Sequence, residues 1–161
     1  MNAKKDQKLT DNGNHVHAPM WKRFTLQTKE EMSVFLDALL AELIQATENE
    51  RDVFAVRLAM EEAVTNALEH GTRGSPQKSV RVCYSLDHTC FLTKVEDDGA
   101  GFSPLAAPDP TLPENIERER GRGLLLMRHY MTSVRFNKSG NRVTMCKCWS
   151  TEPQSPTVTP D

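Results

Sequence analysis

The sequence lacks the features that define several common classes of protein. Its longest apolar run near a predicted helix, Leu124–Met127, is far too short to span a membrane. Lysine and arginine together number 20 against 22 aspartates and glutamates, so the chain has no basic excess for general nucleic-acid binding. The segment Met1–Asp6 contains lysines, but no apolar stretch follows it, which argues against a secretory signal. We therefore expect a cytoplasmic protein with no membrane partner and no direct nucleic-acid partner.

Cysteine is scarce and shows no metal-binding pattern. The four cysteines, Cys83, Cys90, Cys146 and Cys148, include no Cys-x-x-Cys pair and no standard zinc spacing. All four lie in segments that we predict to be strands. Cys146 and Cys148 are two residues apart, so in a strand both thiols point to one face. Reduced, half-buried thiols are the expected state.

A chain of 161 residues fits one domain of ordinary size. Residues 1–18 are polar and have no hydrophobic periodicity, and residues 150–161 contain three prolines among serines and threonines. Both ends are predicted to be flexible tails. Residues 19–149, which are patterned and contain no internal repeat, are predicted to form the single domain.

Hydrophobic periodicity within residues 19–149 predicts three helices and five strands. The first helix begins at Thr28-x-x-Glu31, which has the pattern of a capping box. In chain order, the predicted elements are strand 21–27, a helix from Thr28, a helix from about Arg51 to Gly71, strands 80–86 and 90–95, a long loop 99–122, a helix from Leu124 to about Met131, and strands 133–136 and 142–149. This order predicts an α+β fold, a two-layer α/β sandwich with helices on one face of a mixed, mostly antiparallel sheet.

The second predicted helix carries two polar residues one turn apart. Glu62 and Asn66 are separated by four positions, so their side chains lie on one helical face. A carboxylate and an amide oxygen suit a hard cation or a phosphate-bound metal, and the carboxylate is also available as a base. From this helix alone, a solvated polar face is the alternative interpretation.

An aspartate at the end of a predicted strand is followed by two closely spaced glycines, in the order Asp97, Gly99, Gly101. The glycines make a turn with little side-chain bulk, so a ligand can approach its backbone closely. A buried Asp97 carboxylate can accept a hydrogen bond from an exocyclic amine such as that of adenine. The alternative interpretation is an acidic surface turn.

Two further glycines, Gly121 and Gly123, stand where the third predicted helix starts. Free backbone N–H groups and the positive end of the helix dipole favour a bound phosphate there. No glycine pair extends to Gly-x-Gly-x-x-Gly after a strand, and no Gly-x-x-x-x-Gly-Lys-Ser/Thr occurs. A dinucleotide-binding fold and a P-loop are therefore not expected.

Taken together and in this order, the three features resemble the N, G1 and G2 boxes of the GHKL ATP-binding superfamily, whose ATP site is the Bergerat fold. The segments Glu61–Gly71 and Gly121–Arg128 look most like those of the anti-sigma-factor serine/threonine kinases. The resemblance covers about residues 20–149. Thr72 and Arg73 follow the first of these segments where the family commonly has an aromatic residue.

The resemblance implies ATP and Mg²⁺ as ligands and assigns roles to individual residues. Asn66 would coordinate Mg²⁺, and Glu62 would be the general base. Asp97, with Gly99 and Gly101, would bind adenine, and Thr144 would help to hold it, partly through water. The residues implied in phosphate binding at the third helix are Arg120, Gly121, Arg122, Gly123 and Leu124. Residues 102–120 would form a lid over the nucleotide.

The resemblance also implies a function and partners. We expect a serine/threonine kinase that phosphorylates a STAS-type antagonist in a partner-switching pathway and sequesters a sigma factor or another regulator. A non-catalytic ATP-dependent binding switch is the main alternative. The catalytic domain of a histidine kinase is disfavoured, because no dimerising helical segment with an acceptor histidine precedes the domain. A homodimer through the first strand and helix is also expected.

Overall fold

The structure is a computed structural model and describes residues 19–73, 75, 77–101 and 119–149, without the side chains of residues 119–121. The predicted tails and most of the predicted lid lie outside the described residues. The elements in chain order are β1 (Lys22–Leu26), α1 (Lys29–Ala46), α2 (Glu50–Asn66), the π-helical turn η1 (Ala67–Gly71), β2 (Val80–Leu86), β3 (Cys90–Asp97), α3 (Glu119–Tyr130), β4 (Ser133–Phe136) and β5 (Arg142–Cys148).

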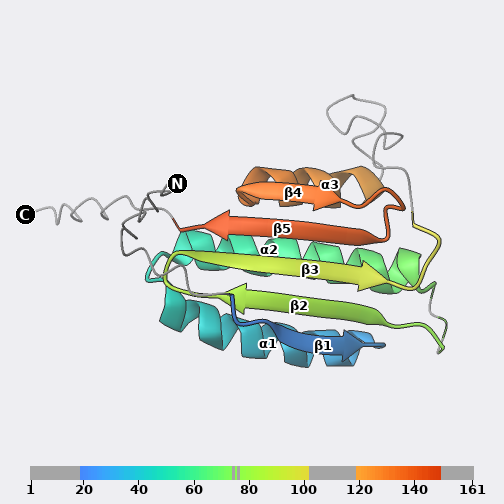
Figure 1. Cartoon of the computed structure of the whole chain (residues 1–161), viewed down its shortest axis with the longest axis horizontal. Coiled ribbons are helices and arrows are strands. Elements are labelled where there is room, and N and C mark those ends of the chain that lie inside the picture. The colour runs from blue at the N-terminus through green and yellow to red at the C-terminus, as the bar shows by residue number, and fades with distance from the viewer. Residues whose placement is uncertain (1–18, 74, 76, 102–118, 150–161) are drawn as a thin grey trace, which may run out of the picture.

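The five described strands form one sheet in the order β1-β2-β3-β5-β4, and the helices cover one of its faces (Figure 1). Every described pairing is antiparallel. The predicted α+β two-layer sandwich is therefore confirmed, with a sheet that is antiparallel throughout its described pairs. Among the described residues, no helix is both long and apolar enough to cross a bilayer.

Local sequence signals fix the ends of several elements. The Thr28 hydroxyl accepts a hydrogen bond from the Glu31 amide at 3.1 Å, which confirms the predicted capping box at the start of α1. The Glu31 carboxylate in turn accepts from the Gln27 amide at 2.6 Å. In the β2–β3 hairpin, the Asp87 carboxylate accepts from the amides of Thr89 and Cys90, which closes the tight turn.

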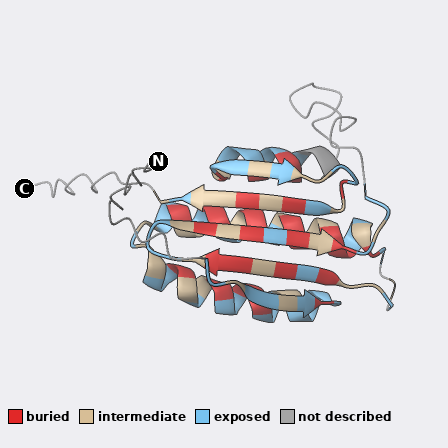
Figure 2. Cartoon of the chain, viewed as in Figure 1, coloured by how far each residue is buried: buried red, intermediate tan, exposed pale blue. Residues whose placement is uncertain are grey.

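The hydrophobic core lies between the sheet and the helices. Burial alternates along β2, β3 and β5, so that one face of these strands packs against the helices (Figure 2). Leu43 of α1, Val64 of α2 and Phe91 of β3 are fully buried, and each such side chain contributes about 1.5–3 kcal/mol to folding. The core also contains an ion pair between Lys147 Nζ of β5 and Asp52 Oδ1 of α2, 3.1 Å apart.

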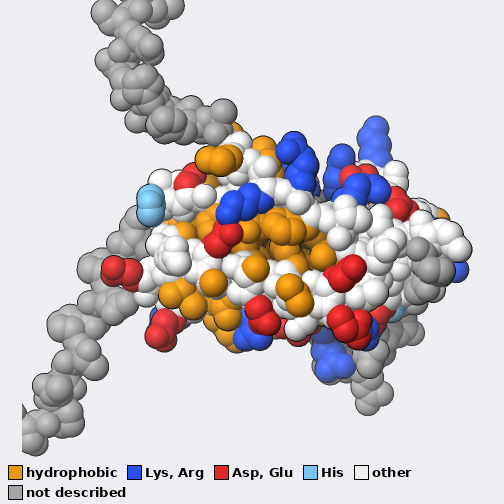
Figure 3. Space-filling view, turned by 90° about the horizontal axis from the view of Figure 1, so that it is seen from below, with side chains coloured by type: hydrophobic (Ala, Val, Ile, Leu, Met, Phe, Trp, Pro, Cys, Tyr) orange, Lys and Arg blue, Asp and Glu red, His pale blue; other side chains and the backbone are white. Residues whose placement is uncertain are grey.

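The side of the molecule formed by β1 and α1 exposes apolar side chains. Figure 3 views this side and shows them gathered near its middle, with charged groups around them. Val34 and Ile44 of α1 are largely exposed, as is Met20 just before β1. Because β1 is an edge strand, its outer backbone groups also lie on this side.

Candidate functional site

The three sequence features meet at one end of the sandwich. The C-terminal end of α2, the end of β3 and the beginning of α3 lie at the same side of the sheet (Figure 1). The glycines show how close these segments are. Gly123 of α3 lies against Glu62 and Asn66 of α2, and Gly71 of η1 lies against Asp97 of β3. The sequence features that suggested a nucleotide site are therefore neighbours in space.

Glu62 and Asn66 face the same point on α3. A Cβ atom built on Gly123 would lie 2.5 Å from Glu62 Oε2 and 3.2 Å from Asn66 Nδ2. Real Cβ atoms do not come as close as 2.5 Å, so glycine at position 123 lets the Glu62 carboxylate lie directly against the backbone of α3. The carboxylate and the amide thus form one polar group beneath the first turns of α3.

The environment of Glu62 favours its protonated form. Burial raises the pKa of Glu62, and the neighbouring Glu61 raises this pKa further, while the positive charge of Arg122 lowers it. A carboxylate with a raised pKa is a stronger base once it has ionised, so its chemistry suits proton transfer.

Asp97 is enclosed by two glycines. Its side chain is 9% exposed, and a Cβ atom added to Gly71 would lie 2.5 Å from Asp97 Oδ1. A Cβ atom added to Gly99 would lie 2.6 Å from the same oxygen. The Gly99 amide donates a hydrogen bond to Asp97 Oδ1 at 2.7 Å. Burial raises the pKa of Asp97, and the hydrogen bond from Gly99 opposes this rise.

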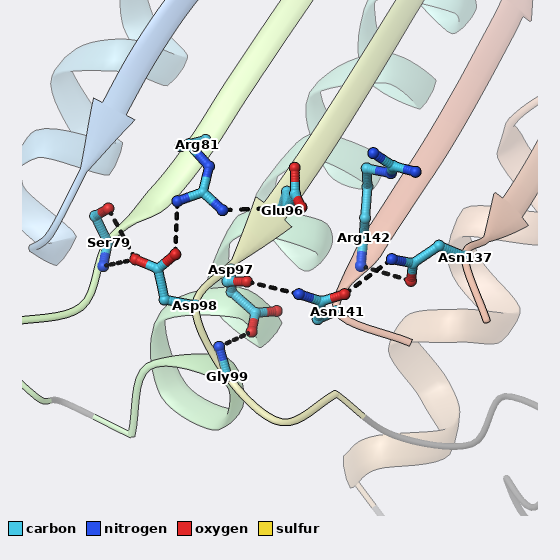
Figure 4. A network of polar contacts seen from close by, with 9 residues as sticks. All are labelled: Ser79, Arg81, Glu96, Asp97, Asp98, Gly99, Asn137, Asn141 and Arg142. Atoms are coloured by element: carbon cyan, nitrogen blue, oxygen red, sulfur yellow. Dashed lines mark hydrogen bonds and ion pairs between the residues drawn. The ribbon is translucent and has the colours of Figure 1, made fainter. Parts of the chain in front are cut away.

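The adjacent Asp98 has the opposite environment, as Figure 4 shows. Asp98 accepts hydrogen bonds from the amide and hydroxyl of Ser79, and its Oδ1 lies 2.6 Å from Arg81 Nη1. The hydrogen bond with Arg81 is the main reason why the pKa of Asp98 is lowered. Asp98 therefore joins the ends of β2 and β3, whereas Asp97 is the buried carboxylate beside the glycines.

A further residue, Asn141, fixes the position of Asp97 and was not predicted from the sequence. Asn141 Nδ2 donates to the Asp97 carbonyl oxygen at 3.0 Å, and the Asp97 amide donates to the Asn141 carbonyl at the same distance (Figure 4). Asn137 Nδ2 in turn donates to Asn141 Oδ1 at 2.8 Å. The sequence signal was its place directly after Gly140 in the predicted turn between the last two strands.

Gly101 holds the Asp97 turn against the β4–β5 turn. Its φ of +76° lies in the left-handed region that favours glycine, and an added Cβ atom would overlap the Ser139 carbonyl and lie 3.0 Å from the Asn141 amide nitrogen. The expected backbone role of Gly101 in shaping this turn therefore has a structural basis.

The last turn of the second helix is π-helical. Residues Ala67–Gly71 form η1, and the Thr72 amide donates to the Ala67 carbonyl at 2.9 Å. Such wider turns are rare and frequently occur at functional sites. Thr72, which stands where the family commonly has an aromatic residue, is buried and donates its hydroxyl to the Leu68 carbonyl at 2.7 Å. This turn places Gly71 against the Asp97 carboxylate.

The third helix begins earlier than predicted. Its described part begins at Glu119 rather than at Leu124, so Gly121 and Gly123 both lie within the helix. Gly123 allows the close contact with Glu62. The role of Gly121 in phosphate binding stays a prediction. The side chain of Arg120 lies outside the described part of the chain.

Two other predicted site residues do not lie with the rest. The Leu124 side chain is buried in the core, with Met127, where α3 packs on α2. Thr144 pairs with the exposed Lys94 of β3 and Arg135 of β4. Because strand side chains alternate, Thr144 points away from the helices while Asp97 points toward them. The register therefore does not support an adenine contact by Thr144.

Comparison with known proteins identifies the class of this domain. Residues 25–147 match the model of the histidine kinase-like ATPase domain, so the chain belongs to this family. Among curated proteins, it is 30% identical over 116 residues to the anti-sigma F factor of Halalkalibacterium halodurans, covering 70% of this chain and 77% of the relative.

Two further anti-sigma F factors show the same likeness. The protein of Clostridium perfringens is 32% identical over 113 residues, covering 69% of this chain and 79% of the relative. The protein of Bacillus licheniformis is 34% identical over 87 residues, covering 52% of this chain and 59% of the relative. The chain is thus an anti-sigma-factor-like ATPase domain at about 30% identity, and its family implies ATP binding.

The donor set at the site fits Mg²⁺ held together with phosphate. Mg²⁺ prefers oxygen ligands and is commonly bound by one or two side chains plus substrate phosphates. Asn66 and Glu62 offer such oxygens side by side. Within the described residues, no group of three or more histidines, cysteines and acidic residues is arranged to hold a metal.

Proposed function

We propose that this protein is a serine/threonine kinase that uses Mg-ATP to phosphorylate a STAS-type antagonist protein in a partner-switching pathway. Within the same proposal, the unphosphorylated antagonist competes with a sigma factor or a similar regulator for this chain. The observation that carries the proposal is that Glu62 and Asn66 both lie against Gly123, while Asp97 lies against Gly71 at the end of the π-helical turn. These contacts support the proposal because they bring to one end of the sandwich the three side chains that it uses as base, metal ligand and purine-binding carboxylate.

Each residue has a distinct part in the proposed reaction. The Asp97 carboxylate accepts a hydrogen bond from the adenine amino group, and the glycines around it let the base approach. The backbone amide of Gly121, in the first described turn of α3, contacts phosphate, and Asn66 would hold Mg²⁺, which would offset the phosphate charge. Glu62 takes the proton from the acceptor hydroxyl as the phosphoryl group is transferred. Arg122, whose positive charge acts on Glu62, is the arginine assigned to the terminal phosphate in this proposal.

The environment of Glu62 gives the proposed reaction a defined pH dependence. The carboxylate must be ionised to act as a base, and its pKa is raised above the usual value for glutamate by burial and by Glu61. The rate of transfer is therefore expected to fall with decreasing pH through this raised pKa. The Glu61→Gln variant removes one cause of the shift, so its acid limb should move to lower pH.

The test is transfer of phosphate to a candidate STAS-domain protein, such as one encoded beside this chain. Glu62→Gln should abolish phosphoserine or phosphothreonine formation while leaving ATP binding intact. Glu61→Gln is the matched control, because it removes an adjacent, exposed carboxylate and should retain transfer. Transfer by Glu62→Gln at the wild-type rate would remove the base assignment. Tight ATP binding without transfer to any such antagonist would instead favour a non-catalytic, nucleotide-dependent switch.

Self-association is part of the same proposal. The exposed apolar residues Val34 and Ile44 of α1 support a homodimer on this side of the molecule, as does the edge of β1 that pairs with no other described strand. Light scattering should then give twice the monomer mass, and Val34→Asp should reduce it to that of a monomer. A monomeric wild-type chain at micromolar concentration would contradict this part.

A further inference from the structure

The four cysteines lie on the sheet face that points away from the helices, and three of them, Cys90, Cys146 and Cys148, gather at one end of that face. Cys90 begins β3 and Cys148 ends β5, so both lie at the end of the sheet opposite Asp97 (Figure 1). Their chain neighbours face the helices: Phe91 is buried in the core, and Lys147 pairs with Asp52 of α2. The cysteines, which alternate with these residues, therefore point outward.

The strand register places Cys90 directly opposite Cys148. The Trp149 amide donates to the Thr89 carbonyl at 3.0 Å, which makes Thr89–Trp149 a hydrogen-bonded pair. Hydrogen-bonded and non-hydrogen-bonded pairs alternate along an antiparallel ladder, so the adjacent Cys90–Cys148 pair is non-hydrogen-bonded. Side chains are closest in such pairs, where the Cα atoms lie about 4.5 Å apart. That separation is within the range of about 4.4–6.8 Å seen in disulfides.

Cys146 is also close, but its geometry is less suited to a disulfide with Cys148. The two sulfur atoms are 3.8 Å apart and share a hydrogen bond. Residues two apart in a strand have Cα atoms about 6.7 Å apart, at the upper limit for a disulfide, and nearly parallel side chains. Cys146 is therefore less suited than Cys90 to form a disulfide with Cys148.

The three thiols differ in their access to solvent. Cys148 is exposed, whereas Cys90 and Cys146 are half-buried. Burial raises the pKa of Cys90, and burial together with the hydrogen bond to Cys148 raises the pKa of Cys146 to about 11. Cys90 and Cys146 thus stay protonated at neutral pH. Cys148 is the thiol that a dissolved oxidant reaches first.

We propose that Cys148 and Cys90 form a peroxide-responsive pair that closes to a reversible disulfide between β3 and β5. The Cys148 sulfur attacks one oxygen of hydrogen peroxide and the O–O bond breaks, which leaves a sulfenic acid on Cys148 and releases one water. The Cys90 sulfur then attacks the Cys148 sulfur, the S–O bond breaks, and the departing hydroxide takes the Cys90 proton and leaves as a second water. The two thiols lose two electrons and two protons in total, and a dithiol reductant reverses the change.

The proposal is tested by oxidising the reduced full chain with a small excess of hydrogen peroxide. The number of titratable thiols should fall from four to two, and peptide mapping without reduction should find Cys90 linked to Cys148 in the same chain. Dithiothreitol should restore all four thiols. A thiol count that stays at four, a Cys146–Cys148 link, or a link between two chains would each overturn the proposal.

Single substitutions separate the two steps. Cys90→Ser should stop the reaction at the sulfenic acid of Cys148, which dimedone traps, while Cys146→Ser and the control Cys83→Ser should still close the disulfide. Closure by Cys90→Ser at the wild-type rate would contradict the pairing.

The oxidised wild-type chain should melt about 5 °C above the reduced chain, because the link constrains the unfolded state. ATP binding should not change, because the pair lies at the far end of the sheet from Asp97, so this outcome is independent of the kinase proposal.

Discussion

Substituting Gly123 by alanine should separate the stability of the fold from its activity. The added methyl carbon would lie 2.5 Å from Glu62 Oε2, and ordinary van der Waals contact begins at 3.4 Å. The carboxylate must therefore move by about 1 Å. It can do so, because it is the far end of a flexible side chain rather than backbone.

The expected change in stability is small because two effects oppose each other. Alanine in place of glycine within a helix stabilises by about 0.5–1 kcal/mol. Pushing Glu62 away from its preferred rotamer costs about 0.5–1.5 kcal/mol. The free energy of unfolding should therefore change by no more than about 1 kcal/mol, which shifts the melting temperature by less than about 6 °C.

The expected change in activity is large. A misplacement of about 1 Å at a reacting group can cost about 100-fold in rate. Gly123→Ala should thus lower the single-turnover rate of phosphoryl transfer about 10- to 100-fold, while the chain still folds. Leu125→Ala is the matched control, because it changes an exposed position on the same helix and should leave the rate within about twofold.

A double-mutant cycle identifies the route of the effect. If the new methyl group acts by displacing Glu62, then Gly123→Ala should cause no further loss in a Glu62→Gln background. Phosphate transfer by Gly123→Ala at the wild-type rate would contradict the displacement of Glu62. Unfolding of the variant would contradict it as well, because the contact would then involve rigid groups.

Three further substitutions distinguish the parts of the Asp97 turn. Gly101→Ala should destabilise by about 2 kcal/mol or more in thermal melts, because its φ is +76° and the new methyl group meets the Ser139 carbonyl. Asp97→Asn should weaken ATP binding at least about 10-fold by calorimetry. The raised pKa of Asp97 means that wild-type stability falls as pH rises through that pKa, so Asp97→Asn should be the more stable protein at neutral pH. Asp98→Asn should have the opposite effect. Because the pKa of Asp98 is lowered on folding, its charged form stabilises the wild-type protein at neutral pH, and this stabilisation is lost as the pH falls through the folded-state pKa. Asp98→Asn should therefore melt below the wild type at neutral pH, and the two melting temperatures should converge in acid.

The order and type of the elements were predictable from the sequence because local signals agreed with tertiary packing. The capping box at Thr28 and the tight turn at Asp87 each form as their residue types dictate. The start of α3 was not predictable in this way. Gly121 and Gly123 have low helix propensity, so the sequence favours a later start. Packing of α3 on α2 overrides that local preference, and this packing cannot be seen in the chain itself.

The proposed site was predictable in part, and the errors have a common cause. Glu62 and Asn66 were placed on one face by helical spacing alone, and the structure brings Gly123 to both. The predicted role of Thr144 depended on which face of β5 it occupies. That face is set by the pairing of β5 with β3, which is a long-range property. Asn141 was missed for the same reason, because its contact with Asp97 exists only once the two turns pack together.

Asp97 and Asp98 show why a motif needs the fold to become a site. The two residues are chemically identical and adjacent, and either could serve as the carboxylate of the sequence pattern. The fold separates them: strand alternation turns Asp97 toward the helices, and Arg81 and Ser79 engage Asp98 outside. The hydrogen bond with Arg81 lowers the pKa of Asp98, whereas burial is the main cause of the raised pKa of Asp97 and disfavours its charged form. An amine donor from a ligand would relieve that cost. The cost of burying the Asp97 charge is therefore consistent with the proposal that this carboxylate serves ligand binding rather than stability.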